Sequence, residues 1–410
     1  MKHIYTSIDI GSDSIKVVVC ELFQNKLNLL AASSYKSKGI KKGLITDVEL
    51  AGITIKQAIN EVENILNIKI KKVIVSVPSY LADYSIIKGE VQIQSNIVTH
   101  EDIMKSLEVA MKSKTINGKE MVTILPIDFK IDSSEGIIEP LGMSGNILSS
   151  RSVLVSVPKK NIYSVVGVLE NIGIEVIDIS LNNIGDLYAF KNNNFDNKIA
   201  AIINIGSEIT SVSIYNRNVI VKSSILNMGG KNIDNDIAYM YKVDEETANN
   251  LKTKFAVAHK KYASTSDLYE IKNADGILKV NQLEVSEIVM SRLEELLNLA
   301  KNELNNLTSK QIDYIIITGG VTNTAGFEHL ASEIFPNQVN IGTIKIPGIR
   351  NCKYSACVGN IVYFINKLKL KGKDFTMIND DEAEQMISSS SNRNAPESML
   401  EKIFGYFFNE

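Results

Sequence analysis

Two stretches of this chain, YTSIDIGSDSIKVVVCEL at residues 5–22 and AAIINIGSEITSVSIYNR at residues 200–217, decide its fold class. Each has an apolar run, a turn of glycine and serine, and a second apolar run, which is the pattern of a β-hairpin. The two lie about 195 residues apart, so they indicate two related domains rather than a short-period repeat.

Strand-like and helix-like segments alternate around both hairpins, which predicts an α/β fold. Residues 47–67 have apolar side chains at helical spacing and are followed by the strand-like KKVIVSVP at 71–78. After the second hairpin, residues 284–304 have the pattern of an amphipathic helix, and residues 311–334 that of a strand, a Gly-Gly turn and a helix. From 84 to about 157 the character changes, and we expect a small α+β insertion with its own sheet.

The composition argues against several classes of protein. The net charge of -3 and the pI near 6.0 give no support for a nucleic-acid-binding surface. No stretch approaches the ~20 continuous apolar residues that span a bilayer, and the start lacks the apolar region of a secretion signal. The cysteines and histidines do not have the spacing of a disulfide framework or a metal site, so we expect buried thiols in a reducing cytoplasm.

Four glycine turns offer places for phosphates or a nucleoside. In DIGSDSIK at 9–16, small residues after the strand let backbone N–H groups approach phosphate oxygens, and Lys16 supplies positive charge. Ordinary hairpin turns use the same residues, so this turn and NIGSEIT at 204–210 each leave both interpretations open. Gly319-Gly320 precedes a helix, where bare backbone can lie against a flat base or sugar, and Gly229-Gly230 forms a fourth turn. The four turns in this order are more specific than any one of them.

Two duplicated hairpins with a late strand, Gly-Gly turn and helix resemble the actin/Hsp70/sugar-kinase superfamily, in which ATP lies in a cleft between two related domains. Over nearly the whole chain the segments resemble FtsA, the actin-like family of bacterial cell division. The most discriminating are KGEVQIQSNIVTHEDIMKSLEVA (88–110), LPIDFKIDSSEGIIEPLGMSGNIL (125–148) and SVLVSVPKKNI (152–162), which are similar to the family's inserted subdomain 1C. The remaining segments that resemble the family are 37–63, 229–238, 291–304, 315–327 and 354–364.

The resemblance implies an actin/Hsp70-like two-domain ATPase fold with the FtsA-type 1C insertion. We expect the following division of the chain: 1–83, 159–194 and 346–372 as the core of the first domain (1A), 84–158 as subdomain 1C, 195–230 and 306–345 as subdomain 2A, 231–305 as subdomain 2B, 373–395 as a flexible linker, and 396–410 as an amphipathic membrane-targeting helix.

The resemblance also implies a set of nucleotide-binding residues and the cofactors ATP and Mg²⁺. Asp9 would in addition face Mg²⁺ through water, while Lys252 has a second interpretation as a solvated helix lysine. The residues carried over are Asp9, Gly11, Ser12, Asp13, Ser14 and Lys16 for the first phosphate loop, Asn204, Gly206, Ser207, Glu208 and Thr210 for the second, Gly229, Gly230 and Asp236 for the sugar side, Lys252 from the upper lobe, and Gly319, Gly320 and Val321 for the adenosine wall.

The second phosphate loop departs from the family pattern. That loop usually begins Asp-Ile-Gly-Gly-Gly-Thr, but here Asn204 replaces the aspartate and Glu208 stands where a glycine is expected. A neutral amide binds a hard cation less well than a carboxylate and is a poor proton acceptor. We therefore expect nucleotide to bind while hydrolysis is slow or absent, so that the protein is at most a weak ATPase; the alternative is that Asn204 still acts through a water.

The chain ends in PESMLEKIFGYFFNE at 396–410. With about 100° per residue in an α-helix, its apolar side chains fall within one arc of roughly 180°, and we expect them to enter the membrane interface. Because Lys402 is the main basic residue of the other side, one tail would hold weakly, and a filament of many tails would hold through avidity. The alternative, that the tail docks on its own body, is disfavoured by the long polar linker. The membrane-binding residues are Met399, Leu400, Ile403, Phe404, Phe407 and Phe408.

The resemblance implies a peripheral protein at the division site on the cytoplasmic side of the cell membrane. It would polymerise, anchor the tubulin-like FtsZ ring by binding the FtsZ C-terminal peptide, and help recruit later division proteins. Two alternatives from other classes are a scaffold like the pilus-assembly protein PilM, which captures a peptide, and a phosphotransferase like the sugar kinases. The PilM type would have no use for the aromatic tail, and the replacement at 204–208 disfavours the enzyme.

Overall fold

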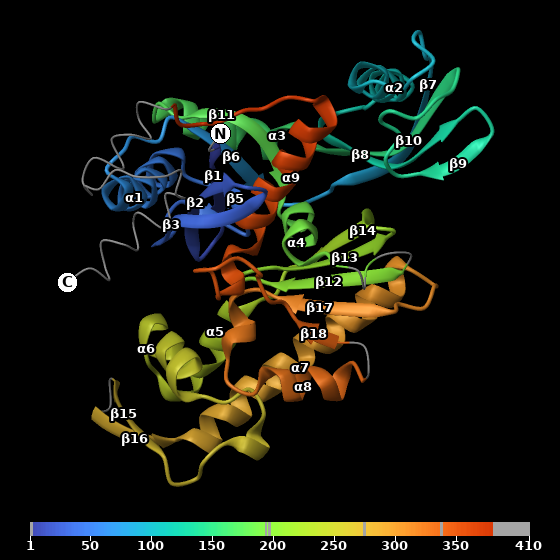
Figure 1. Ribbon diagram of the computed structural model, residues 1–410. Coiled ribbons are helices and arrows are strands. Elements are labelled where there is room, and N and C mark those ends of the chain that lie inside the picture. Colours follow the sequence, from blue (N-terminus) through green and yellow to red (C-terminus); the bar gives the residue numbers. More distant parts are fainter. Residues whose placement is uncertain (1–2, 193–194, 196–197, 274–275, 337–338, 380–410) are drawn as a thin grey trace.

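Two five-stranded sheets form the body of the molecule (Figure 1), and their strand orders are the same when one of the two is read in reverse. The computed structural model describes residues 3–379 except 193–194, 196–197, 274–275 and 337–338. The first sheet has the order β11-β6-β1-β2-β3, with strands β1 (His3–Ile10), β2 (Ser14–Phe23), β3 (Lys26–Lys36), β6 (Lys72–Val77) and β11 (Glu175–Leu181). The second has the order β14-β13-β12-β17-β18, with strands β12 (Ile199–Ile205), β13 (Thr210–Asn216), β14 (Val219–Leu226), β17 (Tyr314–Thr318) and β18 (Val339–Ile341).

The pairing directions also repeat between the sheets. In the first, β1, β2 and β3 form an antiparallel meander, and β6 and β11 are parallel to β1. In the second, β12, β13 and β14 form the meander, and β17 and β18 are parallel to β12. This confirms the predicted α/β fold and shows that the likeness of the two hairpin sequences reflects a duplicated sheet.

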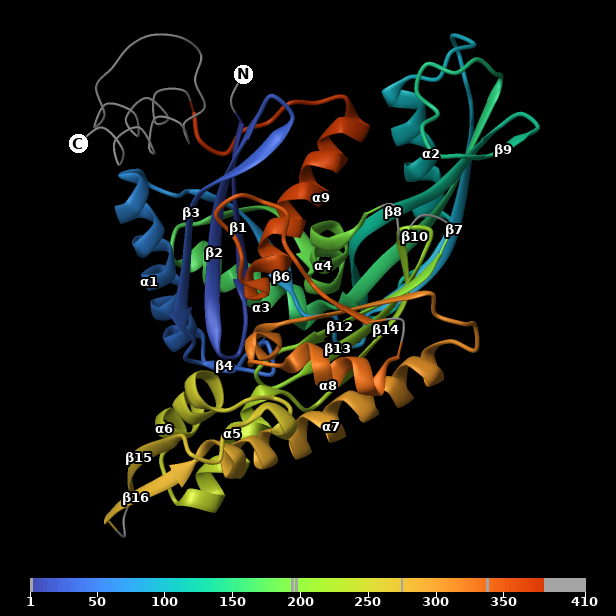
Figure 2. The ribbon, with the colours of Figure 1, turned by 60° about the horizontal axis from the view of Figure 1, so that its bottom comes forward.

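Two helices lie between the sheets, and together with the facing sides of both sheets they form a shared hydrophobic core. These are α4 (Asn182–Phe190) and α9 (Ser355–Lys371), which pack on each other and on β12 and β1 respectively (Figure 1). Alternate residues of β12 face opposite sides: Ala200 and Ile202 join the core of the first domain, while Ala201 and Ile203 join a second core. The long helix α7 (Gln282–Leu307) covers that second face (Figure 2). A sheet covered on both faces requires the nearly continuous apolar strands seen in the sequence.

The first long helix of the chain has a capping residue at each end. The helix α1 (Val48–Leu66) packs on β3, and the side chain of Asp47 accepts a hydrogen bond from the Leu50 N–H at 3.0 Å at its start. It ends at Asn67, whose φ of 53° is left-handed. The helix α3 (Lys159–Asn171) packs beside α1.

Residues after β6 form the predicted insertion with its own sheet. The strands β7 (Asp83–Gln92), β8 (Lys119–Ile131), β9 (Ser134–Ile137) and β10 (Ile147–Pro158) are antiparallel in the order β7-β10-β8-β9. The helix α2 (His100–Lys112) lies directly on β7. The backbones are so close that a Cβ at Gly89 would come within 2.0 Å of the Ser106 carbonyl oxygen. Figures 1 and 2 show this insertion at one side of the first domain.

The second domain carries a smaller lobe below its sheet in Figure 1. It contains α5 (Gly230–Tyr241), α6 (Glu245–Asn250), the start of α7, and the two-stranded sheet of β15 (Leu268–Asn273) and β16 (Gly276–Asn281). The helix α8 (Phe327–Ile334) follows β17 and packs on α7. A two-stranded loop of β4 (Ile40–Lys41) and β5 (Leu44–Ile45) precedes α1 in the first domain.

The linker begins later than the sequence suggested. The Ile4 N–H donates to Thr376 Oγ1 at 3.0 Å, and the Met377 N–H donates to the Ile4 carbonyl at 2.9 Å. Met377 and Ile378 are 7% and 5% exposed, and Phe375 packs edge-on against a ring of α9. Residues 373–379 are therefore docked beside β1, and their placement in a flexible linker was wrong, because the polar composition of the wider segment hid three apolar side chains.

The predicted tail helix and its membrane-binding residues lie outside the described residues. These are Met399, Leu400, Ile403, Phe404, Phe407 and Phe408. Within the described part of the chain, every helix is too short or too polar to cross a membrane.

The crossing of α4 and α9 gives a stability prediction. A Cβ at Gly359 would lie 1.7 Å from the Gly185 carbonyl oxygen, so Gly359→Ala must force the two helices apart. We expect it to lower the free energy of unfolding by about 3 kcal/mol or more. The matched control is Gly167→Ala in α3, where a Cβ meets open space and helix propensity favours alanine by up to about 1 kcal/mol. Urea unfolding of both variants measures the difference, and equal stabilities would show that the crossing is not tight.

Candidate functional site

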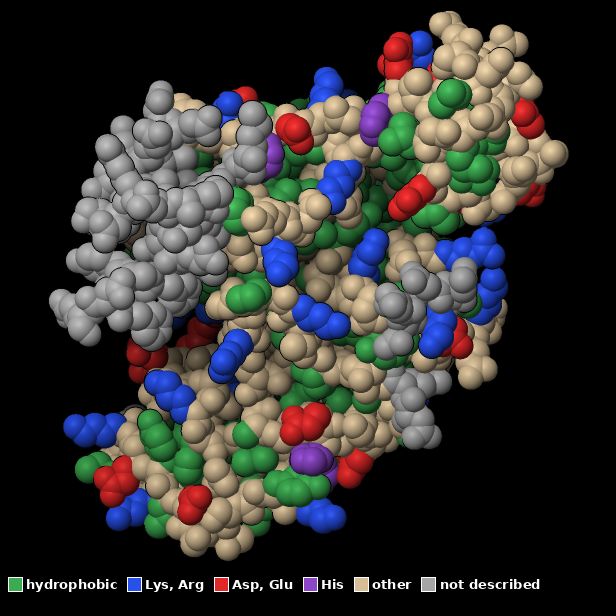
Figure 3. All heavy atoms as spheres, in the orientation of Figure 1, with side chains coloured by type: hydrophobic (Ala, Val, Ile, Leu, Met, Phe, Trp, Pro, Cys, Tyr) green, Lys and Arg blue, Asp and Glu red, His purple; other side chains and the backbone are tan. Residues whose placement is uncertain are grey.

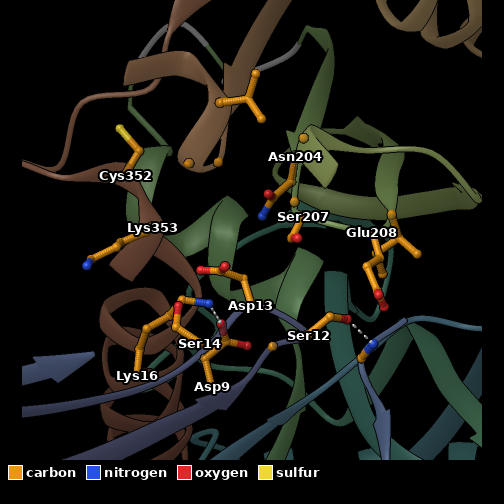
Figure 4. Close-up of a pocket in the computed structure, with 18 of the residues that line it drawn as sticks. Asp9, Ser12, Asp13, Ser14, Lys16, Asn204, Ser207, Glu208, Cys352 and Lys353 are labelled. Atoms are coloured by element: carbon orange, nitrogen blue, oxygen red, sulfur yellow. Dashed lines mark hydrogen bonds and ion pairs between the residues drawn. The ribbon is translucent and has the colours of Figure 1, made fainter. Parts of the chain in front are cut away.

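The glycine turns of both sheets meet around one cavity of about 300 Å³ between the two domains. Figure 4 shows the side chains of the first turn facing those of the second across it. Of the residues predicted from the sequence, the following line the cavity: Asp9, Gly11, Ser12, Asp13, Ser14, Lys16, Asn204, Gly206, Ser207, Glu208, Gly230, Lys252, Gly319, Gly320 and Val321.

The first turn is built around a charged pair. Asp9 is the penultimate residue of β1 and lies opposite Lys16 in β2, and Lys16 Nζ donates to Asp9 Oδ2 at 3.1 Å. Burial acts to lower the pKa of Lys16, but the charge of Asp9 and its hydrogen bond outweigh burial, and the pKa is raised. A Cβ at Gly11 would lie 2.8 Å from Lys16 Nζ. Glycine at this position therefore lets the ammonium group lie beneath the turn.

The second turn carries an amide where the first carries a carboxylate. Asn204 is the penultimate residue of β12, and its Nδ2 donates to Asp186 Oδ2 of α4 at 2.6 Å. The Ser355 hydroxyl, at the start of α9, donates to Asp186 Oδ1 at 2.5 Å. Asp186 is 1% exposed, and burial raises its pKa to about 6, although both hydrogen bonds act to lower it. The acid that Asn204 contacts is thus behind the cavity wall.

The carboxylate of Glu208, which lines the cavity, is held by contacts at one end of it. Its Oε2 accepts a hydrogen bond from the Lys42 N–H at 2.6 Å, and its Oε1 lies 3.8 Å from Lys231 Nζ. Lys42 belongs to the loop between β4 and β5 of the first domain, and the next N–H in that loop, of Gly43, donates to Ser12 Oγ at 2.7 Å. The loop therefore joins both turns and closes one end of the cavity, and Figure 4 shows Glu208 and Ser12 directed toward it.

Close backbone packing forms the third wall. Gly319 has a φ of 104°, and a Cβ there would lie 2.2 Å from the Ile205 carbonyl oxygen. Only glycine fits this conformation and this approach. Gly230 begins α5 beside it, and a Cβ there would lie 2.8 Å from Val321 Cγ2.

Lys252 is a buried residue of the cavity rather than a solvated helix lysine. It is 7% exposed, and its Nζ donates to Asp234 Oδ2 at 2.7 Å and to the Gly230 carbonyl at 3.2 Å. Burial raises the pKa of Asp234, and Lys252 acts against this rise. The Lys252 ammonium group is therefore buried, paired with Asp234, and directed at the Gly229-Gly230 turn where α5 begins.

Three predicted residues lie outside the cavity lining, and this is a correction. Asp236 is on another side of α5, where Arg292 Nε donates to its carboxylate at 2.6 Å, and Asp234 takes the place expected for it. Thr210 is buried and donates to the Met228 carbonyl at 2.8 Å, and Gly229 packs against the second turn, where a Cβ would lie 2.5 Å from the Gly206 carbonyl oxygen. Thr210 and Gly229 therefore support the turn from behind.

Other residues of the site were missed by the sequence analysis. Asp234 and Ser211 lie beside predicted residues in the same segments, and only the phase of the helix or strand decides that they face the cavity, whereas the others come from helices and loops without a recognisable motif. Those that line the cavity include Asn182, Ser211, Asp234, Asn249, Asn323, Thr324, Lys353 and Ser355.

The arrangement suits an anionic, phosphate-bearing ligand. Two glycine turns line the cavity with small residues, and Lys16 and Lys252, each paired with an aspartate, bring ammonium groups to it from opposite domains. The residues fit Mg²⁺ less well: Asp9 is occupied by Lys16, and Asn204 is neutral. No group of three or more His, Cys, Asp or Glu suited to a metal ion occurs in the part of the chain that the structure describes. A divalent cation at this site would be held through water and through the ligand.

Comparison with known proteins points to one family. Residues 201–359 match the model of "Cell division protein FtsA", and residues 84–156 match that of the "SHS2 domain inserted in FTSA". The cell division protein FtsA of Bacillus subtilis is 26% identical over 394 residues, which cover 95% of this chain and 90% of that protein. The FtsA of Streptococcus pneumoniae is 28% identical over 351 residues, covering 85% of this chain and 77% of that protein.

Solved structures show the same actin-like fold. A PilM–PilN complex of type IV pilus biogenesis has a TM-score of 0.58 at 12% identity, covering 88% of this chain and 98% of the other. MreB5 of Spiroplasma citri bound to AMPPNP has a TM-score of 0.56 at 15% identity, covering 90% of this chain and 99% of the other. At these identities the likeness concerns the fold alone.

The buried carboxyl of Asp186 gives a pH prediction. Its pKa of about 6 in the folded protein lies above the unfolded value, so the stability it contributes is full below about pH 4 and is lost as the pH rises through 6. The loss is roughly 3 kcal/mol at about 1.4 kcal/mol per pKa unit. We expect Asp186→Asn, which has no such titration, to gain stability relative to wild type by this amount between about pH 4 and pH 7. Urea unfolding across this range tests it, and a pH-independent difference between the two proteins would contradict it.

Proposed function

Because this chain is a homologue of the FtsA cell-division proteins along nearly its whole length, we propose that it is an actin-like, ATP-binding division protein that links the FtsZ ring to the cytoplasmic membrane. The observation that carries the proposal is the four-stranded insertion after β6, because it coincides with a model defined by its insertion in FtsA.

ATP is the proposed ligand of the cavity. The first turn, with Lys16, and the second turn would surround the phosphates, and Gly319, Gly320 and Val321 would lie against the adenosine. Asp234 rather than Asp236 would face the sugar side. A structural neighbour was solved with AMPPNP and another form of it with ADP, which supports a nucleotide in this fold. Mg²⁺ would accompany ATP and offset phosphate charge on the Asp9 side.

The polymer and its partners are proposed from the homology. The insertion would serve contacts with copies of the chain or with later division proteins, and the lobe of α5, α6 and β15–β16 would receive the FtsZ C-terminal peptide. Hydrophobic side chains are exposed on the insertion (Figure 3), including Ile97, Ile138 and Leu141, which are 51%, 68% and 49% exposed. Exposed apolar groups of this kind support a contact surface.

The membrane contact is proposed from the sequence of the tail. Residues 373–379 dock beside β1, so the linker leaves the body at the first domain. The apolar arc of residues 399–408 would insert in the lipid interface, and many tails on one filament would act together. A PilM-like scaffold is supported by likeness of fold alone.

Attachment to lipid is tested by co-sedimentation with phosphatidylcholine vesicles, with and without phosphatidylglycerol, in the presence of ATP. We expect the full chain to pellet with both, since insertion is mainly apolar, and Phe404→Glu/Phe407→Glu to remain in solution. The charge-matched control is Ser398→Glu/Gly405→Glu, which adds two carboxylates on the polar side of the helix. A truncation should end after Asn379 rather than Lys373, since Met377 and Ile378 belong to the core.

If the aromatic variant pelleted as well as wild type, the tail would not be the anchor. If all forms stayed in solution while FtsZ was bound, a scaffold that reaches the membrane through a partner would be the better account.

Turnover is tested by phosphate release with ATP and Mg²⁺. We expect bound ATP with slow release or none, because Asn204 is a poor proton acceptor and Glu208 is held by the Lys42 N–H. Equilibrium binding of a fluorescent ATP analogue to the same preparation provides the positive signal. Rapid phosphate release that Asp9→Ala abolishes would contradict the expectation.

A further inference from the structure

The two hairpins of the duplicated sheet differ in one pair of facing residues. In the first, Asp9 lies opposite Lys16 in β2 and beside Ser76 in β6. At the equivalent place in the second, Asn204 lies opposite Ser211 in β13 and beside Thr318 in β17. The first hairpin thus has a charged pair of facing residues at this place, and the second hairpin has a neutral pair.

The second hairpin has no carboxylate at position 204, which is equivalent to Asp9, but a carboxylate is present one layer deeper. Asp186 of α4 lies 2.6 Å from Asn204 Nδ2, and its other oxygen accepts the Ser355 hydroxyl at 2.5 Å. It is 1% exposed, so a ligand in the cavity cannot reach it. The acid therefore remains in the site but is withdrawn from contact, and the residue that meets the ligand is the amide.

Asp186 also determines the orientation of the Asn204 side-chain amide. A carboxylate accepts and does not donate, so the amide nitrogen must face it and the amide oxygen must face elsewhere. That oxygen lies on the side of Gly319, where an added Cβ would come within 2.9 Å of it. Ser355 and Asn204 both line the cavity, and Asp186 holds both from behind.

We propose that Asp186 is a positioning residue that fixes Asn204 in the cavity, and that this buried Asp186–Asn204 pair makes a nucleotide site whose affinity depends little on Mg²⁺. The inference rests on the proposed ATP site and deepens it. With an acid at 204 the second turn would offer a carboxylate to a hydrated cation; with the amide at 204 and the acid at 186 it offers only a neutral oxygen there.

The test is an exchange of the two residues. Asn204→Asp alone would bring a second carboxylate against Asp186, and we expect a lower unfolding temperature by several degrees. Asp186→Asn/Asn204→Asp restores a donor opposite an acceptor and moves the acid into the cavity. We expect this exchange to recover most of the lost unfolding temperature, which makes the two substitutions strongly non-additive. The matched control is Ser207→Asp, an added acid in the same turn that Asp186→Asn should not relieve.

The second readout is the dissociation constant of a fluorescent ATP analogue, measured near neutral pH with Mg²⁺ and with a chelator. We expect wild type to change by no more than about twofold, and the exchange to bind about tenfold more tightly with Mg²⁺ than without. A merely structural role for Asp186 would not alter the dependence on Mg²⁺.

Additive effects on the unfolding temperature, or an exchange that binds ATP as independently of Mg²⁺ as wild type, would overturn the inference. A folded wild type that bound no ATP under either condition would instead refute the proposed site. A wild type that bound ATP only with Mg²⁺ would overturn the inference and leave the proposed site intact.

Discussion

The close approach of Gly185 in α4 and Gly359 in α9 is the constraint on which the cleft depends. A Cβ at Gly359 would lie 1.7 Å from the Gly185 carbonyl oxygen, so the two backbones touch. Asp186 follows Gly185, and Ser355 lies about one helical turn before Gly359. The crossing therefore brings a carboxylate and a hydroxyl together, and Asn204 from the other sheet completes the group. One contact between helices thereby sets both the joint between the sheets and the inner wall of the cavity.

Local patterns predicted the fold because the duplicated hairpins and the insertion are each written in contiguous sequence. Alternating or continuous apolar runs with glycine turns identified β1–β2 and β12–β13, and the shared strand order of the two sheets agrees with their likeness. The backbone of the site was predictable for the same reason, since Gly11 and Gly206 form tight turns and Gly319 has a conformation and an approach that other residues do not fit. What sequence patterns indicate well is backbone conformation.

Side chains that meet through the tertiary fold were not predictable in this way. Asp234 and Asp236 stand in one motif, NIDNDIA, and only the phase of α5 decides that Asp234 faces Lys252 and Asp236 faces Arg292. Asp186 and Ser355 reach the site from helices about 170 positions apart. The docking of residues 376–378 likewise depends on the first residues of β1, which precede its pairing with β6, and the polar surroundings of Met377 and Ile378 do not reveal it.

Binding a nucleotide and hydrolysing it require different groups in such a site. The two turns differ from each other in which of these groups they provide. Holding phosphates requires N–H groups and cations, which both turns, Lys16 and Lys252 present. Activating water requires a carboxylate exposed to it. Asp9 is paired with Lys16, Asp186 is buried, and Glu208 is bonded to the loop at Lys42, so these three acids are already engaged, while Asp13 of the first turn is exposed. In the proposed filament, where each tail would hold the membrane weakly and many tails would hold it firmly, a long-lived bound nucleotide would suffice, because avidity depends on the number of linked tails and not on hydrolysis.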